Sequence, residues 1–275
     1  MRALVATSLA PRLAPGEDGG DAIQSMCVRS LHDAFGAVAA FNYAEEVAGV
    51  PTAAPFARVV DLGPRAGSPF RRPLVDLGVV MRHLAGTGET LFALANSDAY
   101  VALDAGEVAD VLRVARDGVV VFQRHETGNL ACGHGPAYTQ GYDVVVFGRP
   151  ALEAVTLDGL AFGMPWWDYA LPVMALSAGL PLYRGRPGAV RHASHDPRWS
   201  RELWRDGLAA YMANLSRQNA RLGAPPLLRA MADVTGMLAR THAIAPLYGG
   251  EQIYEFGTMF ALFNVAAIER AATPM

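Results

Sequence analysis

Lysine is absent from the sequence, because all 23 basic residues of the 275-residue chain are arginine. This absence excludes any mechanism that needs a Schiff-base lysine or the lysine of a phosphate-binding P-loop. Charge is also scarce: 18% of the residues are charged, and the formal net charge is −3. Without a basic excess to neutralise the phosphates of a duplex, nucleic acid is not an expected partner.

Cysteine is equally scarce. Cys27 and Cys132 can form neither a disulfide framework nor a four-cysteine zinc site, so we expect a protein of the reducing cytoplasm. The longest apolar runs, such as 256–268, are shorter than the about 20 residues that span a bilayer, and no transmembrane segment is expected. Residues 1–12 resemble a marginal signal peptide, but Pro11 and Arg12 follow the apolar residues at once, which favours a first buried strand.

Apolar residues make up 52% of the chain, and strand and helix patterns alternate over the first 200 positions. Apolar runs predict strands at 2–7, 37–41, 58–62, 89–96, 118–122 and 142–147, with short strands at 181–183 and 189–192. Helical spacing predicts helices at 25–35, 74–84, 106–116 and 166–178. This alternation is typical of an α/β fold with a mostly parallel sheet and helices on both faces.

Two regions depart from the alternation. Residues 125–140 are polar and glycine-rich, which predicts a loop. After residue 199 the pattern is wholly helical, at 200–221, 225–240 and 251–272. We therefore expect an α/β domain over 1–200 and a helical C-terminal extension over 201–275. The last helix is apolar nearly all round, which favours burial or a homodimer contact over a peripheral membrane anchor, since it has no basic face.

Asn96, Ser97 and Asp98 directly follow the predicted strand at 89–96. Ligands of open α/β sheets bind outside the carboxyl ends of the strands, and an acidic side chain there can hold a divalent cation that takes phosphate oxygens. Asparagine, serine and aspartate are also favoured turn residues, so a simple turn is the alternative.

Trp166, Trp167 and Asp168 open the predicted helix at 166–178, after a glycine turn. The flat aromatic faces suit a sugar, and the carboxylate can accept a proton from a hydroxyl group. The helix dipole would keep Asp168 ionised at neutral pH, available to accept that proton. The alternative is that Asp168 only complements the helix dipole.

Histidines follow the predicted strand at 189–192, where His192 and His195 precede Asp196. Such a pair can bind a metal, although metal-binding histidines on a helix are usually four positions apart and no helix is evident here. The alternative is that these loop histidines are simple surface or core residues. His125 lies in the predicted polar loop, where it can contact a substrate.

The order of these motifs resembles that of the GT-A glycosyltransferases, the nucleotide-diphospho-sugar transferases, and bacterial members in particular. The resemblance covers about residues 1–200. It rests on the NSD tripeptide 96–98, a Gly141-Tyr142-Asp143 segment, the stretch from Phe162 through Asp168 to Leu171, and the HxxHD strand end 192–196. It implies a three-layer α/β fold and the metal-assisted transfer of a sugar from a nucleotide-diphospho-sugar to a saccharide or other hydroxyl acceptor.

The resemblance also implies roles for individual residues. Asp98 matches the last acidic position of a motif that binds Mn²⁺ or Mg²⁺ on the donor diphosphate, and His195 (or His192) matches a histidine that completes the coordination. Asp168 matches the general base. The remaining matches are binding positions: Thr7, Ser8, Arg12, Asp61, Asn96 and Ser97 for the nucleotide donor, and His125, Trp166 and Trp167 for the acceptor.

One departure from the family pattern keeps other functions open. Asn96 stands where the family has an acidic residue, which weakens metal binding or leaves Asp98 and a histidine to perform it. The alternatives are therefore an inactive protein that binds sugars or nucleotides, and a metal-dependent hydrolase that uses His192, His195 and Asp196. A nucleotidyltransferase fits poorly, because Arg12 is the single basic residue in the glycine-containing loop at 9–20, and no GxGxxG motif supports a Rossmann dehydrogenase.

Overall fold

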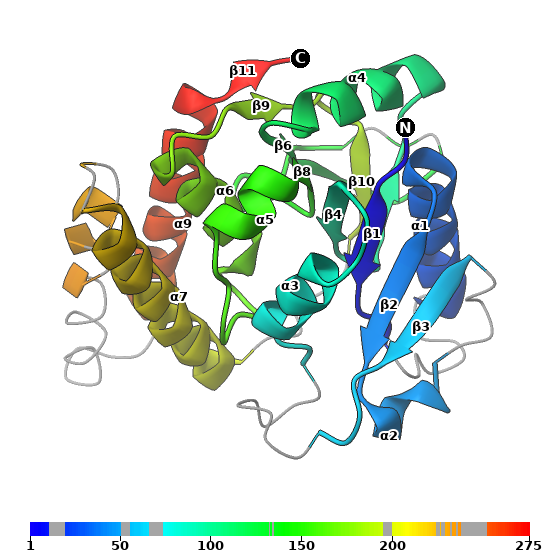
Figure 1. The fold of residues 1–275 in the computed structure, drawn as a ribbon, viewed down its shortest axis with the longest axis horizontal. Coiled ribbons are helices and arrows are strands. Elements are labelled where there is room, and N and C mark those ends of the chain that lie inside the picture. The colour runs from blue at the N-terminus through cyan, green and yellow to red at the C-terminus, as the bar shows by residue number, and fades with distance from the viewer. Residues whose placement is uncertain are drawn as a thin grey trace.

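A computed structural model of the chain describes residues 1–10, 20–50, 56–65, 74–131, 133, 135–194, 200–223 and 252–275, with eight further positions between 226 and 237. The eight-stranded sheet at its centre has the order β11-β9-β6-β8-β4-β1-β2-β3 (Figure 1). Its strands are β1 (Leu4–Thr7), β2 (Val38–Asn42), β3 (Ala57–Asp61), β4 (Leu91–Ala95), β6 (Val119–Phe122), β8 (Val144–Gly148), β9 (Leu182–Arg184) and β11 (Thr273–Pro274).

The direction of the strands explains where a ligand site can form. In this sheet β8 runs antiparallel to both of its neighbours, β4 and β6, and the other paired strands are parallel. From β1 the chain adds β2 and then β3 on one side of the sheet, and then returns to add β4 on the other side of β1. The carboxyl ends of β1 and β4 therefore flank a topological switch point, where open α/β sheets bind their ligands.

Helices cover both faces of the sheet, because the central strands are apolar on both sides. In β4, Phe92 and Leu94 face one core, and Leu91, Ala93 and Ala95 face the other. The first core also contains side chains of α3 (Leu77–Ala85), α5 (Arg149–Ala154), α6 (Trp167–Ser177), α7 (Arg201–Leu222) and α9 (Gln252–Ala271). The second core contains side chains of α1 (Gly20–Phe35) and α4 (Ala105–Ala115). The expected layered α/β fold is confirmed.

A second, three-stranded sheet lies beside the switch point. It consists of β7, β10 and β5, with β10 in the middle, parallel to β7 and antiparallel to β5. Their bounds are β5 (Ala99–Val101), β7 (Arg124–Thr127) and β10 (Val190–Ala193). Because β5 begins directly after Asp98, this sheet brings β10 and β7 to the end of β4.

The C-terminal part shares the core of the α/β part. Ile268 of α9 and Tyr211 of α7 are fully buried, and the short strand β11 extends the large sheet beside β9. The Tyr142 hydroxyl donates to Glu269 of α9 at 2.9 Å, and Glu269 also pairs with Arg184 of β9. None of the helices in the described ranges is long and apolar enough to cross a membrane.

The structure departs from the sequence expectations at short elements. The segment 125–140 is expected to be a loop throughout, but its first residues belong to β7, because they pair with β10 across 66 positions of the chain. The four-residue helix α2 (Ala44–Val47), the helix α5 and the strands β5 and β11 are not among the elements expected from the sequence. Elements this short form through tertiary contacts, which local patterns do not report.

Candidate active site

The candidate site begins where β4 ends. Because β8 is antiparallel to β4, Asp143, the residue before β8, lies beside Asn96, the residue after β4. The Asn96 backbone N–H donates to the Asp143 carbonyl at 3.0 Å, and Asn96 Nδ2 donates to Asp143 Oδ1 at 3.3 Å. Asp143 is 1% exposed, whereas the Asp98 side chain is 37% exposed. The end of β4 and the start of β8 therefore bring together one buried and one accessible carboxylate.

His192 reaches the same place from β10. It pairs with Ala99 in β5, so its ring lies next to Asp98, and its Nε2 is 3.2 Å from Asp98 Oδ2. Asp98, Asp143 and His192 each offer one ligand atom, and these atoms lie within 4.8 Å of one another. His195, the first choice of histidine from the sequence, lies outside the described residues, as does Asp196, and the histidine beside Asp98 is His192.

Two residues of β7 complete the polar cluster. Glu126 Oε2 accepts from His192 Nδ1 at 3.0 Å, and Glu126 Oε1 accepts from Arg124 Nε at 2.8 Å. Arg124 Nη1 in turn donates to both carboxylate oxygens of Asp143, at 3.2 and 3.1 Å. We call Asp98, His192, Glu126, Arg124, Asp143 and Asn96 the carboxylate ring, since each contacts the next and Asn96 and Asp98 share one turn.

The electrostatics of the carboxylate ring favour a bound cation. Burial alone would lower the pKa of His192, but its hydrogen bond to Asp98 and the charges of Asp98 and Asp143 raise it to about 9. Burial raises the pKa of Asp143, although Arg124 and His192 oppose this. Burial would lower the pKa of Arg124, but Asp143 and Glu126 outweigh it and raise that pKa. Three carboxylates thus surround two cations, which leaves an excess negative charge.

The donor set fits a divalent metal ion. Carboxylate oxygens suit Mg²⁺ and Mn²⁺, and an imidazole suits transition metals, so two carboxylates with one imidazole can hold a divalent metal ion. Asn96, which departs from the family pattern, is not a ligand in this arrangement. It donates to Asp143, and Asp143 supplies the second carboxylate from the neighbouring strand. The departure therefore leaves two carboxylates at the site.

Asp168 lies near the carboxylate ring, in the first turn of α6. A Cβ on Gly141 would overlap Asp168 Oδ2, so the carboxylate occupies space that the absent side chain of Gly141 leaves. Burial and the charge of Asp143 raise the pKa of Asp168 to about 7, against the hydrogen bonds of two backbone N–H groups. The helix end therefore does not hold the pKa of Asp168 low, because burial and the charge of Asp143 outweigh those hydrogen bonds.

The tryptophans beside Asp168 belong to the core. Trp166 is 1% exposed, and its Nε1 donates to the Trp204 carbonyl at 3.0 Å. Trp167 is 3% exposed and packs edge-on against Phe162. Trp166 has a φ of 86°, a left-handed conformation that no other non-glycine among the described residues adopts. Neither ring presents a free face to an acceptor in this structure.

The other predicted binding residues have mixed surroundings. Thr7, at the end of β1, is fully buried, and its hydroxyl has no hydrogen-bond partner among the described residues; Ser8 beside it is half-buried. Asp61 accepts from the Gly63 N–H at 2.7 Å, which is a turn contact. His125 Nδ1 lies 2.9 Å from the Gly135 carbonyl and so holds that loop in place. Arg12 lies outside the described residues.

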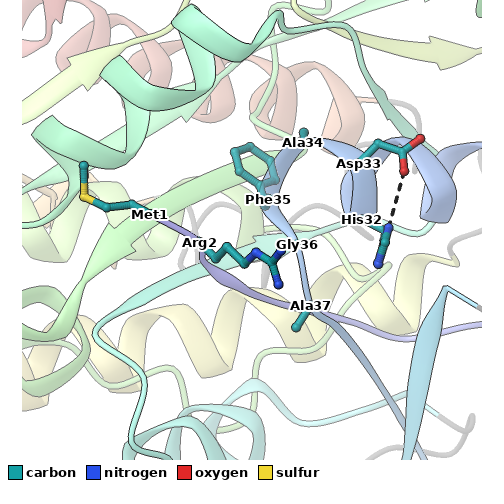
Figure 2. A pocket seen from close by; sticks show the side chains of 8 residues that line it. All are labelled: Met1, Arg2, His32, Asp33, Ala34, Phe35, Gly36 and Ala37. Carbon is teal, nitrogen blue, oxygen red and sulfur yellow. Dashed lines mark hydrogen bonds and ion pairs between the residues drawn. The ribbon is translucent and has the colours of Figure 1, made fainter.

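A surface pocket lies at the opposite end of β1 (Figure 2). It is lined by Met1 and Arg2 before β1 and by residues 32–37, which form the end of α1 and its connection to β2. These residues lie at the amino ends of the strands, whereas the carboxylate ring follows the carboxyl end of β4. The pocket is therefore separate from the candidate site.

No protein-family model and no curated protein match this sequence. Among solved structures, the chain is similar to a mannosyltransferase from Pyrobaculum calidifontis in complex with GDP-Man and Mn²⁺, at 15% identity over 97% of this chain and 86% of that chain, with a TM-score of 0.46. It is also similar to mannose-1-phosphate geranyltransferase from Thermus thermophilus, at 18% identity over 70% and 73% of the two chains, with a TM-score of 0.35. Staphylococcus aureus TarS gives 9% identity over 98% and 55%, with a TM-score of 0.48. At these scores the similarities assign no activity, and the function rests on the site.

Proposed function

We propose that the protein is a glycosyltransferase that moves a sugar from a nucleotide-diphospho-sugar donor to a hydroxyl acceptor with the help of Mn²⁺ or Mg²⁺. The observation that carries this proposal is the cluster of Asp98, Asp143 and His192, whose ligand atoms lie within 4.8 Å of one another at the switch point of the sheet. Asp98, Asp143 and His192 would hold the metal ion, which would neutralise charge on the departing diphosphate.

The nucleotide part of the donor is assigned to the neighbouring end of β1. The hydroxyl of Thr7 is buried without a partner among the described residues, and such a group normally has one. A nucleotide bound there would accept or donate that hydrogen bond, and Ser8 is next to it. The donor would then extend from Thr7 across the switch point to Asp98.

Asp168 is the proposed general base. The acceptor hydroxyl gives its proton to the Asp168 carboxylate while its oxygen bonds to the anomeric carbon, and the bond to the nucleoside diphosphate breaks with its electron pair. A pKa near 7 suits this role, because proton transfer is most efficient when the pKa of the base is close to the working pH. A single displacement of this kind inverts the anomeric configuration.

A turnover assay tests the proposal. Purified protein is incubated with a panel of nucleotide-diphospho-sugars and Mn²⁺, and the release of nucleoside diphosphate is measured with and without hydroxyl acceptors. We expect release with at least one donor, its loss in Asp98→Ala, and an unchanged rate in Asp117→Asn, whose side chain is exposed just beyond the end of α4. Release that is equal in the wild type and in Asp98→Ala would contradict the proposal.

A further inference from the structure

Glu126 makes a directed contact with the imidazole of His192. Its Oε2 lies 3.0 Å from His192 Nδ1. Because a carboxylate only accepts hydrogen bonds, Nδ1 carries a proton toward Glu126, and Nε2, which is directed at Asp98, is the nitrogen that would give up its proton to bind a metal. A histidine that binds a metal through one nitrogen commonly donates its other N–H to a carboxylate, which fixes the tautomer and the ring orientation.

Arg124 connects this carboxylate to the second metal ligand. Its Nε donates to Glu126 at 2.8 Å, and its Nη1 donates to both oxygens of Asp143. The guanidinium also lies 3.9 Å from the ring centroid of Tyr138, which stacks on it. One planar group thereby holds Asp143 on one side and the partner of His192 on the other.

The sheet alone does not require these side chains. Strands β7 and β10 are already joined by their backbone ladder, in which Glu126 is paired with His192. Arg124 and Glu126 are two positions apart in β7, so both project from one face toward the site. Burying several charges in one cluster is weak evidence for a stabilising role, since well-packed apolar residues are often as stable. A role toward the metal ligands explains why the charges are there.

We propose that Glu126 and Arg124 are positioning residues that align His192 Nε2 and the Asp143 carboxylate for the metal ion. This inference rests on the proposed function, because it needs a metal at Asp98, Asp143 and His192. It goes beyond the residues of the NSD turn and assigns a role to two side chains of β7 that touch neither the donor nor the acceptor in the proposal.

Metal binding tests the inference without any catalytic assay. Mn²⁺ dissociation constants are measured on the full chain by the electron paramagnetic resonance signal of free Mn²⁺. Glu126→Gln keeps the shape of the side chain but removes its charge, and we expect Mn²⁺ to bind about 10–100-fold more weakly. The matched control is Glu107→Gln, which removes another glutamate that pairs with an arginine, Arg186, away from the carboxylate ring. The control should bind Mn²⁺ as the wild type does.

A second measurement needs no variant and remains decisive if Glu126→Gln does not fold. Long-range ¹H–¹⁵N spectra of the wild type with Zn²⁺, a diamagnetic probe, report the protonation of each His192 nitrogen. We expect a proton on Nδ1 and none on Nε2. The opposite pattern would overturn the inference, and so would wild-type Mn²⁺ affinity in a folded Glu126→Gln variant. Asp98→Ala separates this inference from the proposed function. If Asp98→Ala loses Mn²⁺ binding, the proposed metal site stands even where one of these two results overturns the role of Glu126. Unchanged Mn²⁺ binding in Asp98→Ala would refute the metal site itself.

Discussion

Replacing Asp168 by asparagine removes a charge while it keeps the shape of the side chain. The pKa of Asp168 is raised from 3.8 to about 7, so the folded protein binds this proton more tightly than the unfolded chain does. Wild-type stability must therefore fall as the pH rises from about 4 to about 7. Since one pKa unit corresponds to about 1.4 kcal/mol, the full shift destabilises the wild type by about 1.6 kcal/mol at pH 5 and about 4 kcal/mol at pH 8.

Asparagine carries no charge at either pH, so Asp168→Asn should be more stable than the wild type, and the gain should grow by about 2–3 kcal/mol between pH 5 and pH 8. These values are upper bounds, because the partly buried carboxyl retains some contact with water. Urea unfolding at both pH values measures the difference. The control Asp117→Asn replaces an exposed carboxylate and should change stability by less than about 0.5 kcal/mol at either pH.

The same variant should lose transfer activity, because a positioned base commonly contributes about 10²–10⁴-fold to the rate. Wild-type kcat/KM should rise with pH through about pH 7 as Asp168 loses its proton, and the residual rate of Asp168→Asn should lack this limb. Sugar transfer by Asp168→Asn at the wild-type rate would exclude Asp168 as the base, and a stability difference that does not change with pH would exclude its raised pKa.

Three further predictions concern the surroundings of the carboxylate ring. Gly141→Ala places a Cβ where Asp168 Oδ2 lies, so it should displace the base and reduce transfer at least about 10-fold. Mn²⁺ binding, measured by titration, should stay within about twofold of the wild type. Asn96→Asp adds a fourth carboxylate to the carboxylate ring, beside Asp143, so without metal it should lower the melting temperature by several degrees. Mn²⁺ should then raise the melting temperature of this variant more than that of the wild type, and equal shifts would show that position 96 is remote from the metal. The sugar product, analysed by NMR, should have the inverted anomeric configuration, and retention would rule out Asp168 as the base of a single displacement.

Much of the fold was predictable because apolar runs and helical spacing are local. The strands β4, β6 and β8 are apolar on both faces, and this is the pattern of a strand covered by helices on both sides. The position of the NSD turn after β4 also followed from the sequence. The short strand β7 was not predictable, since its pairing partner β10 lies 66 positions further along the chain.

The site was predictable only where one local motif supplies it. Asp98 and Asp168 stand in motifs, but Asp143 acquires its role from Asn96, 47 positions away, and Glu126 from His192, 66 positions away. The segment 141–143 belongs to the family pattern, but it is the antiparallel pairing of β8 with β4 that places its aspartate. For the tryptophans beside Asp168, the local motif predicted a surface that binds the acceptor. In the structure Trp166 has a left-handed backbone conformation, and both tryptophan rings are packed in the core.

The most direct test of the account is the thermal stability of the protein with nucleotide-diphospho-sugars, with and without Mn²⁺. A ligand that binds the folded state stabilises it by mass action, by about 2.7 kcal/mol at a concentration about 100 times its dissociation constant. We expect at least one nucleotide-diphospho-sugar to raise the melting temperature of the wild type in a strongly Mn²⁺-dependent way, and Asp98→Ala to abolish the Mn²⁺-dependent part. No stabilisation by any of these donors, or the same Mn²⁺-dependent shift in Asp98→Ala, would contradict this expectation.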